Sequence, residues 1–323
     1  MNTFKWLLKR EYWEHRGGLF WAPVITSAIF VFFTIVALAL AAFGINQADE
    51  MEIGLNLSEG VAQLADPANR ADVTAGLELI FYMLGNPVMG VMAVVGFFYC
   101  LGSLYDERKD RSILFWKSLP VSDRETVASK LFTAAIIVPA VGVVGATVTA
   151  LLIMVVLSVF ILMHGANPIY LWDVGAIARA IFNMVATIPV YALWALPTIG
   201  WLMLCSAWFR RVPFIWAVLI PILSGVLVWM VGLMKVFGLG AEWFWAQVVG
   251  RVLSGTLPGM DIIYRMAHNP PEMYGDGPQE IAREISMTAN YTVFAIPQMW
   301  IGIVLGALMI YAAMRLRGTR DEG

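Results

Sequence analysis

Residues 131–163 read LFTAAIIVPAVGVVGATVTALLIMVVLSVFILM, a run without Asp, Glu, Lys or Arg. A helix needs about 20 apolar residues to cross the roughly 30 Å of hydrocarbon in a bilayer. This run is longer than that, and it contains no charged residue that would have to be buried in lipid. It therefore predicts a membrane-spanning helix, and it decides the class of protein.

The same pattern recurs on both sides of this run. Residues 19–43, 79–104, 180–209, 212–234 and 285–314 also lack all four charged residue types. Only 14% of the 323 residues are charged, against about 25% in a typical soluble domain. Unpaired backbone groups in lipid cost several kcal/mol each, so spans of this kind form helices. We expect an all-α membrane protein with six transmembrane helices.

The basic residues indicate the orientation. Segments 1–18, 105–130, 209–212 and 315–323 hold 15 of the 21 Lys and Arg residues. Cytoplasmic loops carry the excess of Lys and Arg, so both termini and the loop between the second and third helices are expected in the cytoplasm. The expected location is the inner membrane of a bacterial cell. The net charge of −2 and the scattered basic residues predict no nucleic-acid partner.

The chain divides into four parts. Residues 1–18 predict an interfacial helix, because Trp6, Tyr12 and Trp13 alternate with basic residues; a disordered basic tail is the alternative. Residues 19–234 hold the first five spans, and residues 235–284 form an outer loop with short helices. Residues 285–323 are the sixth span and a cytoplasmic tail.

The third span is expected to begin before its apolar run. Ser122 and Glu125 have the spacing of a capping box, which starts a helix at residue 123. From there to residue 163 the helix would be roughly 60 Å long. We expect it either to project into the cytoplasm or to bend near Pro139 and Gly142.

Three polar side chains inside the spans are candidates for a substrate path: Asn86, Asn183 and Gln298. Hydrogen bonding between helices is the alternative role for them. A transporter coupled to an ion gradient usually keeps ionisable residues within its spans. The spans here contain no charged residue, which argues against such coupling.

Gly302 and Gly306 form a GxxxG motif in the sixth span. The motif allows helices to approach closely, either within one chain or between two.

The loop after the second span is the most informative segment. Residues 105–125 read YDERKDRSILFWKSLPVSDRE, and Pro120 ends any helix that begins near Asp106. The loop combines charges of both signs with an apolar cluster of Ile113, Leu114, Phe115, Trp116 and Leu119. An apolar cluster in a charged loop favours a partner or the membrane surface. Its acidic residues would be repelled by an anionic leaflet, which favours a soluble partner.

This loop resembles that of type-2 ABC exporter permeases. The similar residues are Asp106-Glu107-Arg108, Ser112, the run from Lys117 to Ser122, and Lys130. The six-span layout with both termini inside is similar too. The resemblance implies a permease subunit whose loop forms a coupling helix, seated on a separate ABC ATPase subunit. It implies two copies of that ATPase and a second permease, either identical (a homodimer) or related.

The resemblance also implies where the ATPase docks. The docking residues would be Asp106, Glu107, Arg108, Arg111, Ile113, Leu114, Phe115, Trp116 and Leu119, with Arg210 and Arg211 as a second contact. ATP and Mg²⁺ would be bound by the partner ATPase.

The sequence contains none of the common catalytic motifs. GxxxxGK[ST], HExxH and GxSxG are all absent, so we expect a non-catalytic chain without metal or cofactor. Two alternatives to the permease remain open. One is a membrane anchor that recruits an ATPase or another complex without transport, and the other is a secondary transporter.

Overall fold

The computed structural model describes residues 3–47, 69–110, 121–164, 167–233, 241–268 and 277–319. These ranges form helices and contain no strand. Six of the helical runs are long and apolar enough to cross a membrane: Gly17–Phe43, Arg70–Lys109, Asp123–Met163, Pro168–Trp194, Pro213–Gly232 and Pro297–Thr319. The prediction of an all-helical protein with six spans is confirmed at this level.

The chain begins with a helix and not with a tail. Helix α1 (Thr3–Glu14) buries Leu7 and Glu11 and leaves Trp6 and Trp13 exposed. A π-helical turn (Gly17–Trp21) then leads into α2 (Ala22–Gln47), the core of the first span.

The second and third spans pack along each other. They are formed by α4 (Arg70–Gly102) and α8 (Val138–Met163). Gly85 makes the approach possible, because a Cβ at this position would lie 2.9 Å from the Cβ of Ala146. Short α5 (Tyr105–Lys109) follows the second span.

The third span is one continuous helical run with an internal irregularity. The predicted capping box is confirmed, since Ser122 and Glu125 bond each other's backbone N–H groups at the start of α7 (Asp123–Phe132). A π-helical segment (Thr133–Ile137) joins α7 to α8. It lies directly before Pro139, whose ring and missing N–H disrupt the regular hydrogen-bond ladder.

The fourth apolar run is not one span. It divides at Ala195 into α9 (Val174–Trp194) and a buried helix, α10 (Leu196–Trp208). Helix α9 starts before the predicted residue 180 because Asp173 caps it, accepting the N–H groups of Gly175 and Ala176. Helix α10 has 13 residues, fewer than a bilayer requires.

The sixth span starts later than predicted. Helix α17 (Pro297–Thr319) begins at a proline, a residue suited to the first turn of a helix. Residues 285–296 instead form the end of α15 (Pro278–Ile285), α16 (Met287–Tyr291) and a 3₁₀ turn (Thr292–Ala295). Ser286 caps α16 by accepting the N–H of Ala289.

The remaining helices complete the second half of the chain. The fifth span is α11 (Pro213–Leu233), followed by α12 (Ala241–Phe244), a π-helical turn (Trp245–Gly250), α13 (Arg251–Ser254) and α14 (Met260–His268). Helices α10 and α17 pack along each other. Gly306 of the GxxxG motif serves this contact, because a Cβ there would lie 2.7 Å from the carbonyl carbon of Leu196, whereas Gly302 lies against Arg251.

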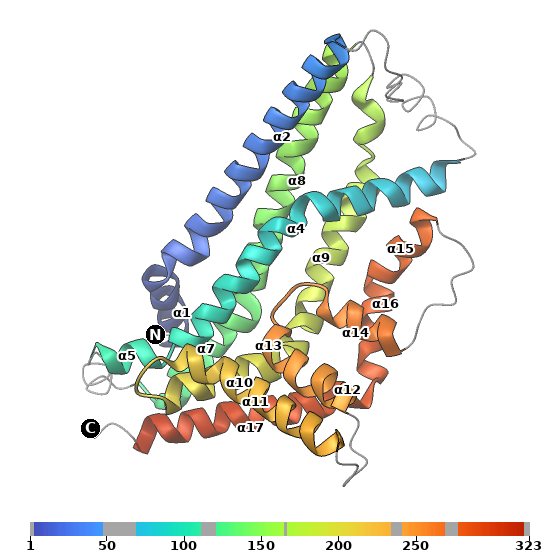
Figure 1. The fold of residues 1–323 in the computed structure, drawn as a ribbon. Coiled ribbons are helices and arrows are strands. Elements are labelled where there is room, and N and C mark those ends of the chain that lie inside the picture. Colours follow the sequence, from blue (N-terminus) through green and yellow to red (C-terminus); the bar gives the residue numbers. More distant parts are fainter. Residues whose placement is uncertain are drawn as a thin grey trace.

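Figure 1 shows how the spans are arranged. Helices α1 and α5 and the end of α17 lie at one end of the molecule, where both termini are found. From this end α2 and α8 extend in one direction, and α17 extends in another. Several charged residues of α1, α5 and α17 therefore lie at the end where the spans converge.

Candidate functional site

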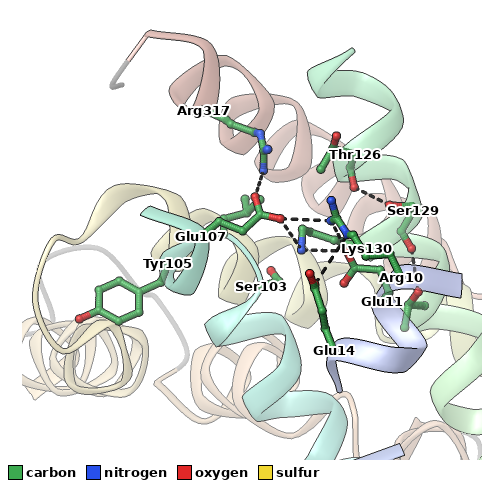
Figure 2. A network of polar contacts seen from close by, with 12 residues as sticks. Arg10, Glu11, Glu14, Ser103, Tyr105, Glu107, Thr126, Ser129, Lys130 and Arg317 are labelled. Atoms are coloured by element: carbon green, nitrogen blue, oxygen red, sulfur yellow. Dashed lines mark hydrogen bonds and ion pairs between the residues drawn. The ribbon is translucent and has the colours of Figure 1, made fainter. Parts of the chain in front are cut away.

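A cluster of buried charges lies where α1, α5, α7 and α17 meet. We call Arg10, Glu11, Glu107, Lys130 and Arg317 the charge cluster; Figure 2 shows these side chains pointing toward one another. Glu11, Lys130 and Arg317 have exposed fractions of 0%, 1% and 4%. Buried charges are costly unless they are paired and hydrogen-bonded, so their geometry decides whether the fold tolerates them.

Lys130 is at the centre of the cluster. Its Nζ lies 3.0 Å from Glu11 Oε1 and 3.1 Å from Glu107 Oε1. One ammonium group from α7 therefore bridges a carboxylate on α1 and a carboxylate on α5.

Glu107 on α5 forms ion pairs with residues of the three other helices of the cluster, α1, α7 and α17. Its second oxygen, Oε2, accepts a hydrogen bond of 2.6 Å from Arg317 on α17, and Arg10 lies 3.2 Å from Oε1. Arg317 also donates to Asp123 at the start of α7, at 2.9 Å. The short helix α5 is thus fixed to α1, α7 and α17 by ion pairs.

Glu11 is held in its ionised form. Arg10 pairs with it at 2.6 Å, and the hydroxyl of Tyr99 donates to it at 2.8 Å. Burial alone would raise the pKa of Glu11, but the positive charges of Lys130 and Arg10 outweigh burial and lower that pKa. The cluster is therefore a network of fixed charges.

A second set of contacts joins α5 to the end of α10. Arg108 donates to the carbonyl oxygens of Ser206 and Phe209, the latter at 3.1 Å. The hydroxyl oxygen of Ser206 accepts the N–H groups of Leu104 and Tyr105 at 3.0 and 2.9 Å. Residues about a hundred positions apart in sequence are thereby brought together.

The structure places the predicted docking residue Arg108 against the turn that holds Arg210 and Arg211. Asp106 is exposed on α5, and Arg210 and Arg211 are exposed in the turn after α10. Glu107 is buried and Arg108 partly buried, and both bond within the chain. Six further predicted docking residues lie outside the described residues: Arg111, Ile113, Leu114, Phe115, Trp116 and Leu119.

The three polar residues predicted for a substrate path do not gather in one place. Asn86 lines a cavity between α4, α8 and α9. Asn183 lines a separate groove, and its side-chain oxygen accepts the N–H of Met287 at 3.2 Å. The backbone carbonyl oxygen of Gln298, and not its side chain, accepts a hydrogen bond from Arg251 at 2.6 Å. A bond between helical segments is therefore the observed role of Asn183.

Sequence reasoning also missed buried ionisable residues in residues 241–268, among them Arg251 and Asp261. The exposed fractions are 7% for Arg251 and 6% for Asp261. The Arg251 guanidinium lies 4.1 Å from the centre of the Trp194 ring, at the end of α9. Both residues belong to the segment predicted as an outer loop, which instead packs against the spans. Apolar neighbours of Arg251, such as Val249 and Val252, were the signal that this segment is buried.

The cavity beside Asn86 has a volume of about 140 Å³. We call it the inner cavity. It lies against the middle of α4 and α9, and the start of α14 closes part of it. Its lining residues are Tyr82, Asn86, Met89, Pro139, Val143, Met184, Thr187, Ile188, Tyr191, Pro258, Gly259, Asp261 and Ile285.

Comparison with known proteins adds no relative. No family model, curated protein or solved structure matched the chain. The function is therefore argued from the residues and their geometry.

Proposed function

We propose that this chain is the membrane-spanning permease subunit of an ATP-driven exporter. In this proposal it lies in the inner membrane of a bacterial cell, with both termini and the loop 105–125 in the cytoplasm. Two copies of a separate ABC ATPase bind ATP and Mg²⁺, and a second permease, identical or related, completes the assembly. Six apolar helices and the resemblance of the loop support this assignment.

One observation carries the proposal: α5 is tied to both halves of the chain. Glu107 links it to α7, where the third span begins, and to α17, where the sixth span ends. Arg108 links it to the turn before the fifth span. A loop that transmits force must be attached firmly to the spans it moves. Buried ion pairs provide such an attachment, because separating the partners leaves a buried charge uncompensated.

The proposed mechanism follows from these attachments. ATP-driven closure of the ATPase subunits displaces the loop 105–125 together with α5. The charge cluster passes that displacement to the third and sixth spans. Two permeases moving in this way would open a path between them, either by alternating access or transiently.

Co-purification tests the proposal. The chain is co-expressed with an ABC ATPase encoded by an adjacent reading frame and isolated through a tag on the chain. Wild type is expected to retain the ATPase, whereas Phe115→Asp combined with Trp116→Asp is expected to lose it. Lys9→Glu is the matched control, because Lys9 is an exposed charge on α1 and lies outside the loop. Equal ATPase recovery with the double variant would remove the docking assignment.

Glu107 has a different role in the proposal, and its variant separates docking from coupling. Glu107→Gln keeps the shape of the side chain but removes the charge that Lys130 and Arg317 share. We expect ATPase binding to persist while stimulation of ATP hydrolysis by the permease falls. Loss of binding with Glu107→Gln would show that the cluster supports docking and not transmission.

A secondary transporter is the second candidate, and the buried Asp261 favours it. Intramembrane carboxyl groups commonly mark ion or substrate pathways, and Asp261 lies beside the middle of two spans. This candidate predicts that no ATPase co-purifies with the wild-type chain, which is the opposite of the result expected above.

A further inference from the structure

The inner cavity combines apolar walls with one acidic group. Met89, Val143, Met184 and Ile188 are among its apolar lining residues. No Lys, Arg or His is among the residues that line it, whereas Asp261 is. Pockets for small molecules have this composition, with apolar walls and a few polar groups that fix the orientation of the ligand.

The carboxyl group of Asp261 has no ion-pair partner in the described part of the chain. Arg265, one helical turn away, lowers the pKa of Asp261 through its positive charge, but burial outweighs this effect and raises that pKa. Arg265 is itself engaged by the carboxylate and the carbonyl oxygen of Glu284. The carboxyl group of Asp261 accepts hydrogen bonds from backbone N–H groups at the start of α14.

Tyr82 provides a second unsatisfied group at the same cavity. Its hydroxyl oxygen is buried and has no hydrogen-bond partner among the residues that the structure describes. Buried polar groups are nearly always hydrogen-bonded, so each exception requires an explanation. The ring of Tyr191 also lines the cavity, and its hydroxyl donates to the carbonyl oxygen of Thr256 at 3.2 Å. Its aromatic face is therefore held in a fixed position.

We propose that the inner cavity binds a small organic cation, a primary ammonium attached to an apolar or aromatic body. Asp261 is the counter-ion, and Tyr82 accepts a hydrogen bond from the ammonium group. The rings of Tyr82 and Tyr191 add cation–π attraction, and the Met, Val and Ile side chains contact the apolar body. A dry cavity of about 150 Å³ holds a molecule of the size of benzene, so the apolar body of the ligand is about the size of one benzene ring. This site lies within one chain and does not depend on an ATPase partner.

Calorimetric titration of the purified full chain in nanodiscs tests this inference. The probe is benzylammonium, and benzyl alcohol is the neutral molecule of the same shape. We expect saturable binding of benzylammonium and at least tenfold weaker binding of benzyl alcohol. Equal affinity for the two probes, or no saturable binding of benzylammonium, would overturn the proposal.

Two variants locate the site. Asp261→Asn is expected to weaken benzylammonium binding at least tenfold, and Tyr82→Phe is expected to weaken it severalfold. Asp72→Asn is the matched control, since Asp72 is an exposed carboxylate on α4 that does not line the cavity; its affinity should equal that of wild type. Unchanged affinity in Asp261→Asn would refute the site. If that variant does not fold, the Tyr82→Phe result and the comparison of the two probes decide the matter.

Discussion

At the scale of single residues, Lys130 is a position where we expect substitution to be strongly destabilising. It is a buried ammonium between two carboxylates, and its removal would leave Glu11 and Glu107 facing each other. Removing one partner of a buried ion pair typically costs about 3–5 kcal/mol. We predict that Lys130→Met lowers the melting temperature in detergent by several degrees, measured by fluorescence-detected size exclusion after heating.

Lys109→Met is the control for this prediction. Lys109 is exposed on α5, so its replacement should change stability by less than about 0.5 kcal/mol. A second change, Glu107→Gln in the Lys130→Met background, should recover part of the loss, because it removes one of the two facing charges. A Lys130→Met variant as stable as wild type would contradict this account of the cluster.

The sequence indicates some residues of this cluster and hides others. Glu107 and Lys130 stand out through the resemblance of the loop, which is a local pattern. Glu11 and Arg317 do not, because they lie 119 and 210 positions from the partners they bond. No spacing rule within one sequence connects residues so far apart. The docking role of Glu107 stays a prediction, and the structure adds that its carboxylate belongs to a buried network of ion pairs.

At the scale of elements, hydropathy finds apolar runs but not the breaks inside them. The start of α7 was predictable because a capping box is a signal within four residues. The break at Ala195 is invisible to hydropathy, because α9 and α10 are both apolar, but it has a local cause: Pro197 lies in the first turn of α10 and cannot continue the preceding helix. Residues 285–296, the 12 residues before α17, are assigned to the sixth span by hydropathy because they also contain no charged residue.

The contact between α10 and α17 gives a prediction for Gly306. A Cβ at this position would meet the backbone of Leu196 and Pro197 at 2.7 and 2.8 Å, so the two helices would have to move apart. Overpacking of this kind typically costs about 1–3 kcal/mol. We predict that Gly306→Ala lowers the melting temperature of the purified chain, although alanine is intrinsically the better helix former.

Gly90→Ala is the matched control for this comparison. Gly90 lies within α4, and a Cβ there would meet nothing within 4 Å. The same substitution should therefore be neutral or slightly stabilising. If Gly306→Ala and Gly90→Ala had the same effect, close packing at the GxxxG motif would not be what joins α10 to α17.

At the scale of the whole molecule, the packing of residues 241–268 changes one inference from the sequence. The six apolar runs contain no charged residue, which argued against an ion-coupled mechanism. Folding nevertheless buries Arg251 and Asp261 against the spans, from a segment that hydropathy assigns to a loop. Composition of the spans describes only the residues they contain. It says nothing of charged residues that a neighbouring segment buries against the spans.

The orientation of the molecule is its last testable property. Arginine and lysine are concentrated at the end where α1, α5 and the last turn of α17 meet, and such an excess marks the cytoplasmic side. Cys100 and Cys205 are both buried, so an introduced cysteine can be labelled selectively. In right-side-out vesicles treated with an impermeant maleimide, Arg283→Cys on α15 should be labelled at once. Lys9→Cys on α1 should be labelled only after permeabilisation, and the reverse order would mean that the chain is inserted the other way.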